Sequence, residues 1–248
     1  MTGNKANPVR SARGASDRSA FFYRPRRPLW VRPGARRKAR RQRLHGALVA
    51  LAVVAGVALL LLWARVSGVV IRPEREVPCD AVFYYQGYAG WKDDRLGDSE
   101  KTMGEYGDGA CCLASLMAMQ HIAAPFEGAV NPGTLNAWLG ANGAYDEDGN
   151  LKWASAAALL GLDLTEQRAN GGSASLLERL IQQEVYAVVQ VDSPGLGRRH
   201  DVLLVGSNHG EFTIVDPADP SKTLNTLGRY KNKIYFMRYL KAPGSETT

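Results

Sequence analysis

An uninterrupted apolar segment from Leu44 to Ala64 limits how this chain can fold more than any other feature. Its 21 residues include one polar side chain, His45. A helix of about 20 apolar residues crosses the hydrocarbon core of a bilayer. A cleaved signal peptide would have a shorter apolar region nearer the start of the chain. The sequence therefore predicts a transmembrane helix at 44–64.

Positive charge is concentrated in front of this segment. Residues 1–43 contain fourteen Lys and Arg and one acid, Asp17, whereas the rest of the chain has 17 basic and 23 acidic side chains. Basic residues beside a span mark its cytoplasmic end. We therefore expect a single-pass membrane protein with a cytoplasmic N-terminus and an extracytoplasmic C-terminal domain.

The basic region itself is rich in Arg, Pro, Gly and Ser, so 1–43 is expected to be a disordered tail. Its predicted contact is anionic membrane lipid, and a partner-binding tail is the alternative. Because the positive charge is confined to this tail and the rest of the chain is mildly acidic, a nucleic-acid partner is not expected.

A short charged stalk is predicted at 65–76, followed by one globular domain at 77–242. Helix-start signals and apolar periodicity predict helices at 110–121, 131–140, 151–160 and 175–183. Asn131 as the N-cap with Pro132 as the first helical residue marks the start of the second, and Ser175 with Glu178 predicts a capping box at the start of the fourth. Runs of β-branched and aromatic residues predict strands at 81–86, 185–191, 201–205, 212–215 and 234–239. Helices followed by a set of antiparallel strands indicate an α+β fold.

Two adjacent thiols, Cys111 and Cys112, lie where a glycine-rich loop enters the first of these helices. Unpaired backbone N–H groups and the positive end of the helix dipole favour a thiolate in a first helical turn. Cys111 is therefore a candidate nucleophile. A small buried residue in a core helix would give the same pattern.

A cysteine nucleophile is usually activated by an imidazole that a third polar group orients. His45 lies in the predicted span, and His121 lies ten residues farther along the helix, about 15 Å from Cys111. Neither can serve. His200 and His209 are left as candidate bases.

A turn at 207–210 predicts a hairpin centred near Asn208. In that register His200 faces Asp216 on the opposite strand, whereas His209 lies at the turn. The hairpin therefore predicts a paired imidazole and carboxylate. A surface histidine and a carboxylate at a strand end are the alternative interpretation of the same two residues.

These motifs resemble the papain-like cysteine peptidases of the bacteriocin-leader type, and especially the stand-alone bacterial domains called peptidase family thirty-nine-like. The resemblance covers about residues 80–240. It is carried by Tyr84-Tyr85-Gln86-Gly87 with Trp91 and Leu96-Gly97, by Cys111 with Ser115-Leu116, by Val130 to Asn136, by His200 and by Val215-Asp216-Pro217.

The resemblance implies a papain-like fold and a thiol hydrolase that cleaves peptide or amide bonds. Cys111 would attack the acyl carbon, His200 would protonate the leaving amine, and Asp216 would fix the imidazole tautomer. Gln86 is the oxyanion candidate. A peptide or protein at the cell surface is the expected substrate.

The chain departs from the family at Ala110 and Cys112, where the family has glycine on either side of the nucleophile. An inactive peptidase-like domain that binds a peptide or a cell-envelope partner is therefore the alternative function. A peptidoglycan amidase of the NlpC or CHAP type is a third. It uses the same chemistry with different motifs around the cysteine.

No cofactor and no metal are expected, because the cysteines and histidines lack paired zinc-ligand spacings. The sequence also has no glycine-rich phosphate loop ending in Lys-Ser or Lys-Thr. The three cysteines are expected on the outer side, where disulfides can form. Cys79 would pair with Cys112 or stay free, and Cys111 would stay free.

Overall fold

The computed structural model describes residues 33–193 and 198–244 of the chain. Its contacts divide the chain into two compact units, 1–59 and 60–248. Most of the predicted basic tail, 1–32, lies outside the described residues.

The first described element is one long helix, α1 (Pro33–Val66), which extends beyond the predicted span at both ends. Its most apolar window, Arg43–Leu60, has a mean hydropathy of 2.0, and none of that window is buried within the chain. In the described ranges, α1 is the one helix long and apolar enough to cross a membrane, judged by length and composition.

The second unit is built on a six-stranded sheet in which every neighbouring pair is antiparallel. The strand order is β2-β8-β3-β4-β5-β6. Its strands are β2 (Asp163–Arg168), β3 (Ala187–Asp192), β4 (Arg199–Asn208), β5 (Glu211–Val215), β6 (Asn225–Thr226) and β8 (Phe236–Lys241).

Side chains alternate between the two faces of this sheet, and each face has its own apolar core. Val188 and Leu203 point into one core, whereas their neighbours Val189 and Val202 point into the other. Strands that are buried on both faces are nearly continuous apolar runs, as β3 and β4 are. This is why their sequence pattern was strong enough to predict them.

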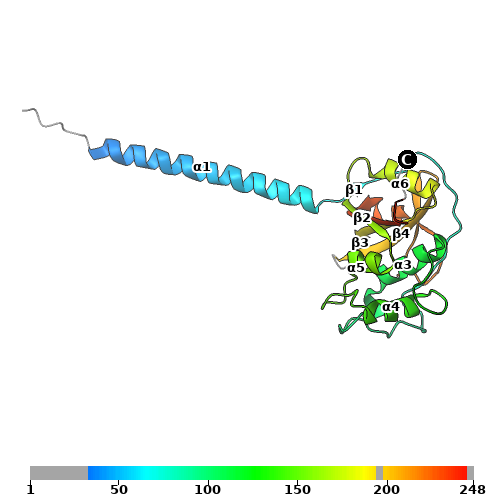
Figure 1. The fold of residues 1–248 in the computed structure, drawn as a ribbon. Coiled ribbons are helices and arrows are strands. Elements are labelled where there is room, and N and C mark those ends of the chain that lie inside the picture. The colour runs from blue at the N-terminus through cyan, green and yellow to red at the C-terminus, as the bar shows by residue number, and fades with distance from the viewer. Residues whose placement is uncertain (1–32, 194–197, 245–248) are drawn as a thin grey trace, which may run out of the picture. The chain divides into compact units, whose positions relative to one another are not determined.

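The helices α2 (Met103–Tyr106), α3 (Asp108–Met119), α4 (Pro132–Ala141) and α5 (Trp153–Leu159) precede most of the sheet. Helix α3 packs on β3 and β4 and is buried along most of its length. Helix α6 (Ser173–Gln182) covers the opposite face (Figure 1). The α+β architecture, with N-terminal helices on a C-terminal antiparallel sheet, is confirmed.

The start of α4 has the predicted cap. The Asn131 side chain accepts a hydrogen bond from the Thr134 backbone N–H at 3.0 Å, and the Thr134 hydroxyl accepts one from the Asn131 N–H at 3.1 Å. The capping box predicted for the helix at 175–183 is wrong, because α6 begins at Ser173. The Glu178 side chain instead accepts hydrogen bonds from a segment outside α6.

That segment contains much of the predicted stalk. Strand β1 (Val69–Val70) pairs with β7 (Lys233–Ile234), and Ile71 is buried in the core under α6. The Glu178 carboxylate accepts backbone hydrogen bonds from Glu74 at 2.5 Å and Arg75 at 2.8 Å. Residues 69–75 are therefore fixed to the globular unit.

Three other sequence predictions differ from the structure. Residues 81–85 belong to no strand, and the edge strand β2 was missed because its sequence, DLTEQR, is polar. The hairpin between β4 and β5 turns at His209 and Gly210, both with positive φ, rather than at Asn208. A bulge between Leu204 and Gly206 then shifts the register by one residue.

Candidate functional site

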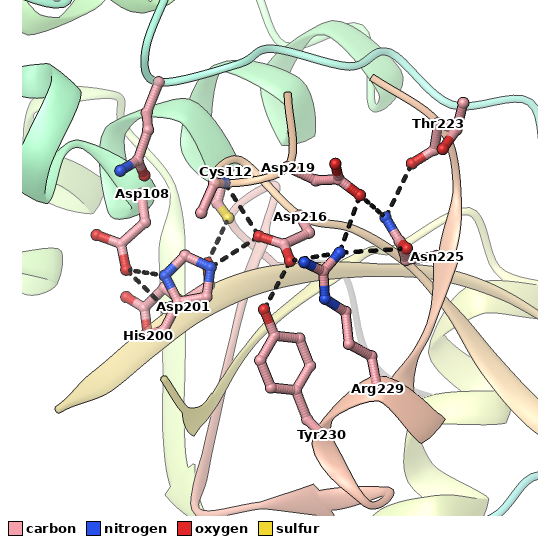
Figure 2. A network of polar contacts seen from close by, with 12 residues as sticks. Asp108, Cys112, His200, Asp201, Asp216, Asp219, Thr223, Asn225, Arg229 and Tyr230 are labelled. Atoms are coloured by element: carbon pink, nitrogen blue, oxygen red, sulfur yellow. Dashed lines mark hydrogen bonds and ion pairs between the residues drawn. The ribbon is translucent and has the colours of Figure 1, made fainter. Parts of the chain in front are cut away.

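His200 lies near the start of β4, next to the segment that follows β5. Its Nε2 is 2.8 Å from Oδ1 of Asp216, as the sequence predicted, although the paired ladder of the hairpin already ends at Leu203 and Val215. Asp216 is fully buried. Its Oδ1 also accepts from the Ala218 N–H at 3.0 Å, and its Oδ2 accepts from the Tyr230 hydroxyl at 2.6 Å (Figure 2).

The other ring nitrogen of His200 contacts a residue that the sequence analysis did not select. Nδ1 is 2.9 Å from Oδ2 of Asp108, in the first turn of α3. The same Oδ2 accepts the backbone N–H of Asp201 at 2.8 Å. Figure 2 shows the imidazole between the two carboxylates of Asp108 and Asp216.

Two carboxylates on one imidazole determine its charge. An ionised carboxylate only accepts hydrogen bonds, so between two ionised carboxylates both ring nitrogens donate and the ring is the imidazolium. Burial by itself lowers the pKa of His200, but the hydrogen bonds to Asp108 and Asp216 outweigh burial and raise the pKa to about 10. Burial would raise the pKa of Asp216, and its hydrogen bond from His200 reverses this and lowers it.

The candidate nucleophile Cys111 is fully buried within α3. Burial raises the pKa of its thiol far above the ordinary value, and the charge of Asp108 adds to this. Within the described part of the chain, no hydrogen bond joins Cys111 to His200. The structure therefore brings His200 and Asp216 together and places Cys111 in the apolar core.

The neighbouring thiol, Cys112, lies one helical turn beyond Asp108. It is also fully buried, and its Sγ donates to the backbone oxygen of Asp201 at 3.5 Å. Burial, followed by the charges of Asp201 and Asp108, raises its pKa well above the ordinary value. All three cysteines are free, so the expected alternative of a bond between Cys79 and Cys112 is not seen.

Gln86, the oxyanion candidate, is held beside the histidine. Its backbone N–H donates to Pro217 at 2.9 Å, and its Nε2 donates to the Gly104 carbonyl at 2.9 Å. Its side chain lines a pocket of about 240 Å³ that Asp108 and His200 also line. The Oε1 atom of Gln86 is buried and has no hydrogen-bond partner among the described residues.

A second pocket of about 290 Å³ lies next to the first. It is lined by Trp153, Tyr145 and Asp201, among others. Tyr106, Asp108, Asn150 and Arg199 line both pockets. The two pockets therefore share part of their lining, including Asp108, and together we call them the Asp108 cleft.

The sequence did contain a signal for Asp108. The family resemblance places a glycine on each side of the nucleophile, and Asp108 is flanked by Gly107 and Gly109, whereas Cys111 is flanked by Ala110 and Cys112. The residue type, a cysteine in the first turn of a helix, pointed to Cys111 as the nucleophile position. The flanking glycines point to Asp108 instead.

Among the described residues, no group of three or more His, Cys, Asp or Glu side chains is arranged to hold a metal ion. The polar network around Asp216 is instead completed by Arg229, which pairs with Asp219 at 2.9 Å (Figure 2).

No protein-family model and no curated protein matches the chain. Solved structures similar to it include two peptidase domains. One is the peptidase domain of Streptococcus ComA, a bi-functional ABC transporter involved in a quorum-sensing pathway, with 19% identity, 54% of this chain and 90% of that chain covered, and a TM-score of 0.38. The other is a C39-like peptidase from Bacillus anthracis, with 13% identity, 68% and 98% covered, and a TM-score of 0.42.

Proposed function

We propose that this chain is a membrane-anchored, extracytoplasmic protein with a papain-like peptidase fold that binds peptides without hydrolysing them through a thiol. The observation that carries the proposal is the contact of 2.9 Å between Nδ1 of His200 and Oδ2 of Asp108. A nucleophile has to lie within hydrogen-bond reach of its imidazole, on the nitrogen that the orienting acid leaves open. Asp108 occupies that place.

The state of the imidazole supports the same conclusion. A general base must be able to accept a proton, and His200 already carries a proton on each nitrogen and donates both to carboxylates. With the pKa of His200 raised to about 10, the neutral base is scarce at neutral pH. An imidazolium held in this way fixes the positions of Asp108 and Asp216 and cannot abstract a proton.

The cleft remains suited to binding. A pocket with unpaired polar atoms among well-packed walls is the usual form of a ligand site. The Oε1 atom of Gln86 and the Tyr145 hydroxyl are buried without partners in the described part of the chain, and each residue lines one of the two pockets. Backbone amide and carbonyl groups of a peptide would satisfy both.

Thiol reactivity of the full chain tests the proposal. Alkylation by iodoacetamide is followed from pH 6 to pH 9 and mapped by mass spectrometry. In the wild-type protein, Cys111 stays unmodified until the protein is denatured. In Asp108→Cys, the new thiol lies against His200 and reacts at pH 6, because a neighbouring imidazolium stabilises the thiolate.

Glu105→Cys is the matched control, since Glu105 is exposed and lines the same cleft without contacting His200. Its thiol should react with an apparent pKa near the unperturbed value of about 8.5. Adding His200→Gln to Asp108→Cys should abolish the reactivity at pH 6. Rapid alkylation of wild-type Cys111 at pH 6 that His200→Gln removes would contradict the proposal and support the Cys111 hydrolase.

A further inference from the structure

Two cations at one end of the Asp108 cleft form no ion pair with any described residue. The Lys101 ammonium lies 4.7 Å from the centre of the Tyr106 ring, and the Arg198 guanidinium lies 4.5 Å from the same centre. All three residues line the pocket that contains Gln86. In the described part of the chain, no carboxylate oxygen lies within ion-pair distance of either cation.

The other basic residues of the cleft are neutralised. Arg199 pairs with Asp192 at 2.6 Å, and Arg238 pairs with Glu166 and with Asp201. Hydrogen bonds from Asn150 lower the pKa of Asp146, and the charge of Lys101 adds to this without an ion pair. The unpaired positive charge of the cleft is therefore located at Lys101 and Arg198.

Glu105 is the acidic residue in this pocket that faces solvent. Its carboxylate makes no ion pair in the described part of the chain. It would repel an anionic ligand, so its charge opposes the two cations. Replacing Glu105 with a neutral residue therefore tests whether the pocket binds anionic ligands more tightly than neutral ones.

The buried oxygen of Gln86 adds a second requirement. Gln86 is 9% exposed, and its Oε1 accepts no hydrogen bond from a described residue, while its Nε2 donates to the Gly104 carbonyl. A buried acceptor without a partner is unfavourable, and a ligand N–H would relieve it. A backbone amide of a peptide supplies such a donor.

We propose that this end of the cleft is a subsite for an acidic residue of a peptide, with the side-chain carboxylate between Lys101 and Arg198 and a backbone N–H on Gln86 Oε1. The inference rests on the proposed peptide-binding function and specifies its ligand. The ring of Tyr106 holds both long side chains in place before binding. Less side-chain freedom is then lost when the carboxylate arrives.

The test is a titration of the ¹⁵N-labelled full chain in detergent micelles, followed by amide chemical shifts. The probes are three capped tripeptides, acetyl-Ala-Glu-Ala-amide and its Gln and Lys counterparts. The Glu peptide should shift the amides of residues 101–108 and 198–200. It should bind at least about threefold more tightly than the Gln peptide, which is the size expected of exposed charge pairs, and the difference should shrink as salt is added.

Matched variants assign the effect to residues. Lys101→Ala with Arg198→Ala should remove the preference for Glu over Gln, and Glu105→Gln should increase it. Lys241→Ala is the control, because Lys241 lies over the Tyr239 ring outside the cleft and its loss should change nothing. Shifts resolved by residue also separate binding in the cleft from binding to the basic tail.

Two results would overturn the inference, and they are distinguishable. Equal affinity of the Glu and Gln peptides, both shifting the cleft amides, would reject the acidic subsite and leave peptide binding intact. If none of the three peptides shifts a cleft amide at millimolar concentration, both the subsite and the proposed function fail.

Discussion

His200 donates from Nε2 to Oδ1 of Asp216 at 2.8 Å, and Asp216 is fully buried. The buried carboxylate is stabilised by hydrogen bonds to both of its oxygens: His200 and Ala218 donate to Oδ1, and Tyr230 donates to Oδ2. A buried charge is tolerated only when such donors replace its lost water. The acid that orients the imidazole is therefore held by a network around it.

Removing one donor from this network should cost stability. In Tyr230→Phe the hydrogen bond of 2.6 Å to Asp216 is lost while the ring stays in the core. We expect the free energy of unfolding to fall by about 1.5–3 kcal/mol, the usual value of a hydrogen bond to a charged group. Urea denaturation followed by fluorescence measures it. Tyr88→Phe, at a ring that is 47% exposed, is the control and should change little.

The charged imidazole makes stability depend on pH. The pKa of His200 is about 10 in the folded chain and about 6.5 when unfolded, so the folded state holds an extra proton between these values. The resulting stabilisation is complete below pH 6.5 and is lost as the pH rises through 10. Its full size is about 3–5 kcal/mol at roughly 1.4 kcal/mol per pKa unit.

The free energy of unfolding, measured from pH 6.5 to pH 10, should therefore decline in the wild-type protein. In His200→Gln it should be lower at pH 6.5 and nearly flat up to about pH 8, above which ionisation of the Cys111 and Cys112 thiols in the unfolded state lowers the stability of both proteins. The titration of Asp201 lies below this pH interval, because burial and the charge of Asp108 raise its pKa only to about 6. A wild-type profile that rises with pH would refute the imidazolium.

The sequence was informative where one segment alone determined the structure. The apolar runs of β3 and β4 and the Asn131-Pro132 start of α4 were all visible, because burial on two faces and a capped helix end leave local patterns. The polar edge strand β2 was not visible. Its pairing with β8 is set by tertiary contacts that its own residues do not encode.

The site was predictable only in part, for a related reason. The predicted hairpin paired His200 with Asp216, although its register differs from the observed one by two to three residues. The two side chains still meet, because both residues lie just beyond the last paired residues of the ladder. Asp108 contacts His200 from a helix 92 residues earlier in the chain. No local periodicity reports such a contact, and only the flanking glycines pointed to it.

Glu178 should fix the segment that follows α1. Its carboxylate accepts the N–H groups of Glu74 and Arg75, so Glu178→Ala leaves two backbone donors without a partner. We expect a loss of about 2–3 kcal/mol and faster tryptic cleavage after Arg75, which mass spectrometry detects. Glu127→Ala, at an exposed residue, should leave both unchanged. Equal cleavage rates in the two variants would show that Glu178 does not hold the segment.

The two glycines beside Asp108 should respond in opposite ways to the same substitution. A Cβ at Gly107 would lie 2.9 Å from the Cα of Met103 and closer still to its carbonyl oxygen, whereas a Cβ at Gly109 meets nothing nearer than 3.7 Å. Gly107→Ala should therefore destabilise the fold by about 2 kcal/mol, because the first turn of α3 has to shift. Gly109→Ala should be neutral or stabilise by up to about 0.5–1 kcal/mol, since alanine favours a helix.

Thermal unfolding of the two variants measures the difference, and the amide shifts of Asp108 and Asp201 report whether the imidazole keeps its partners. If Gly107→Ala moves α3, the hydrogen bond from the Asp201 N–H to Asp108, 2.8 Å in the wild type, should lengthen and its amide signal should shift. Gly109→Ala should leave the backbone geometry in place. Similar losses in both variants would mean that the glycine before Asp108 has no special steric role, and that the position of Asp108 against His200 depends on other contacts of α3.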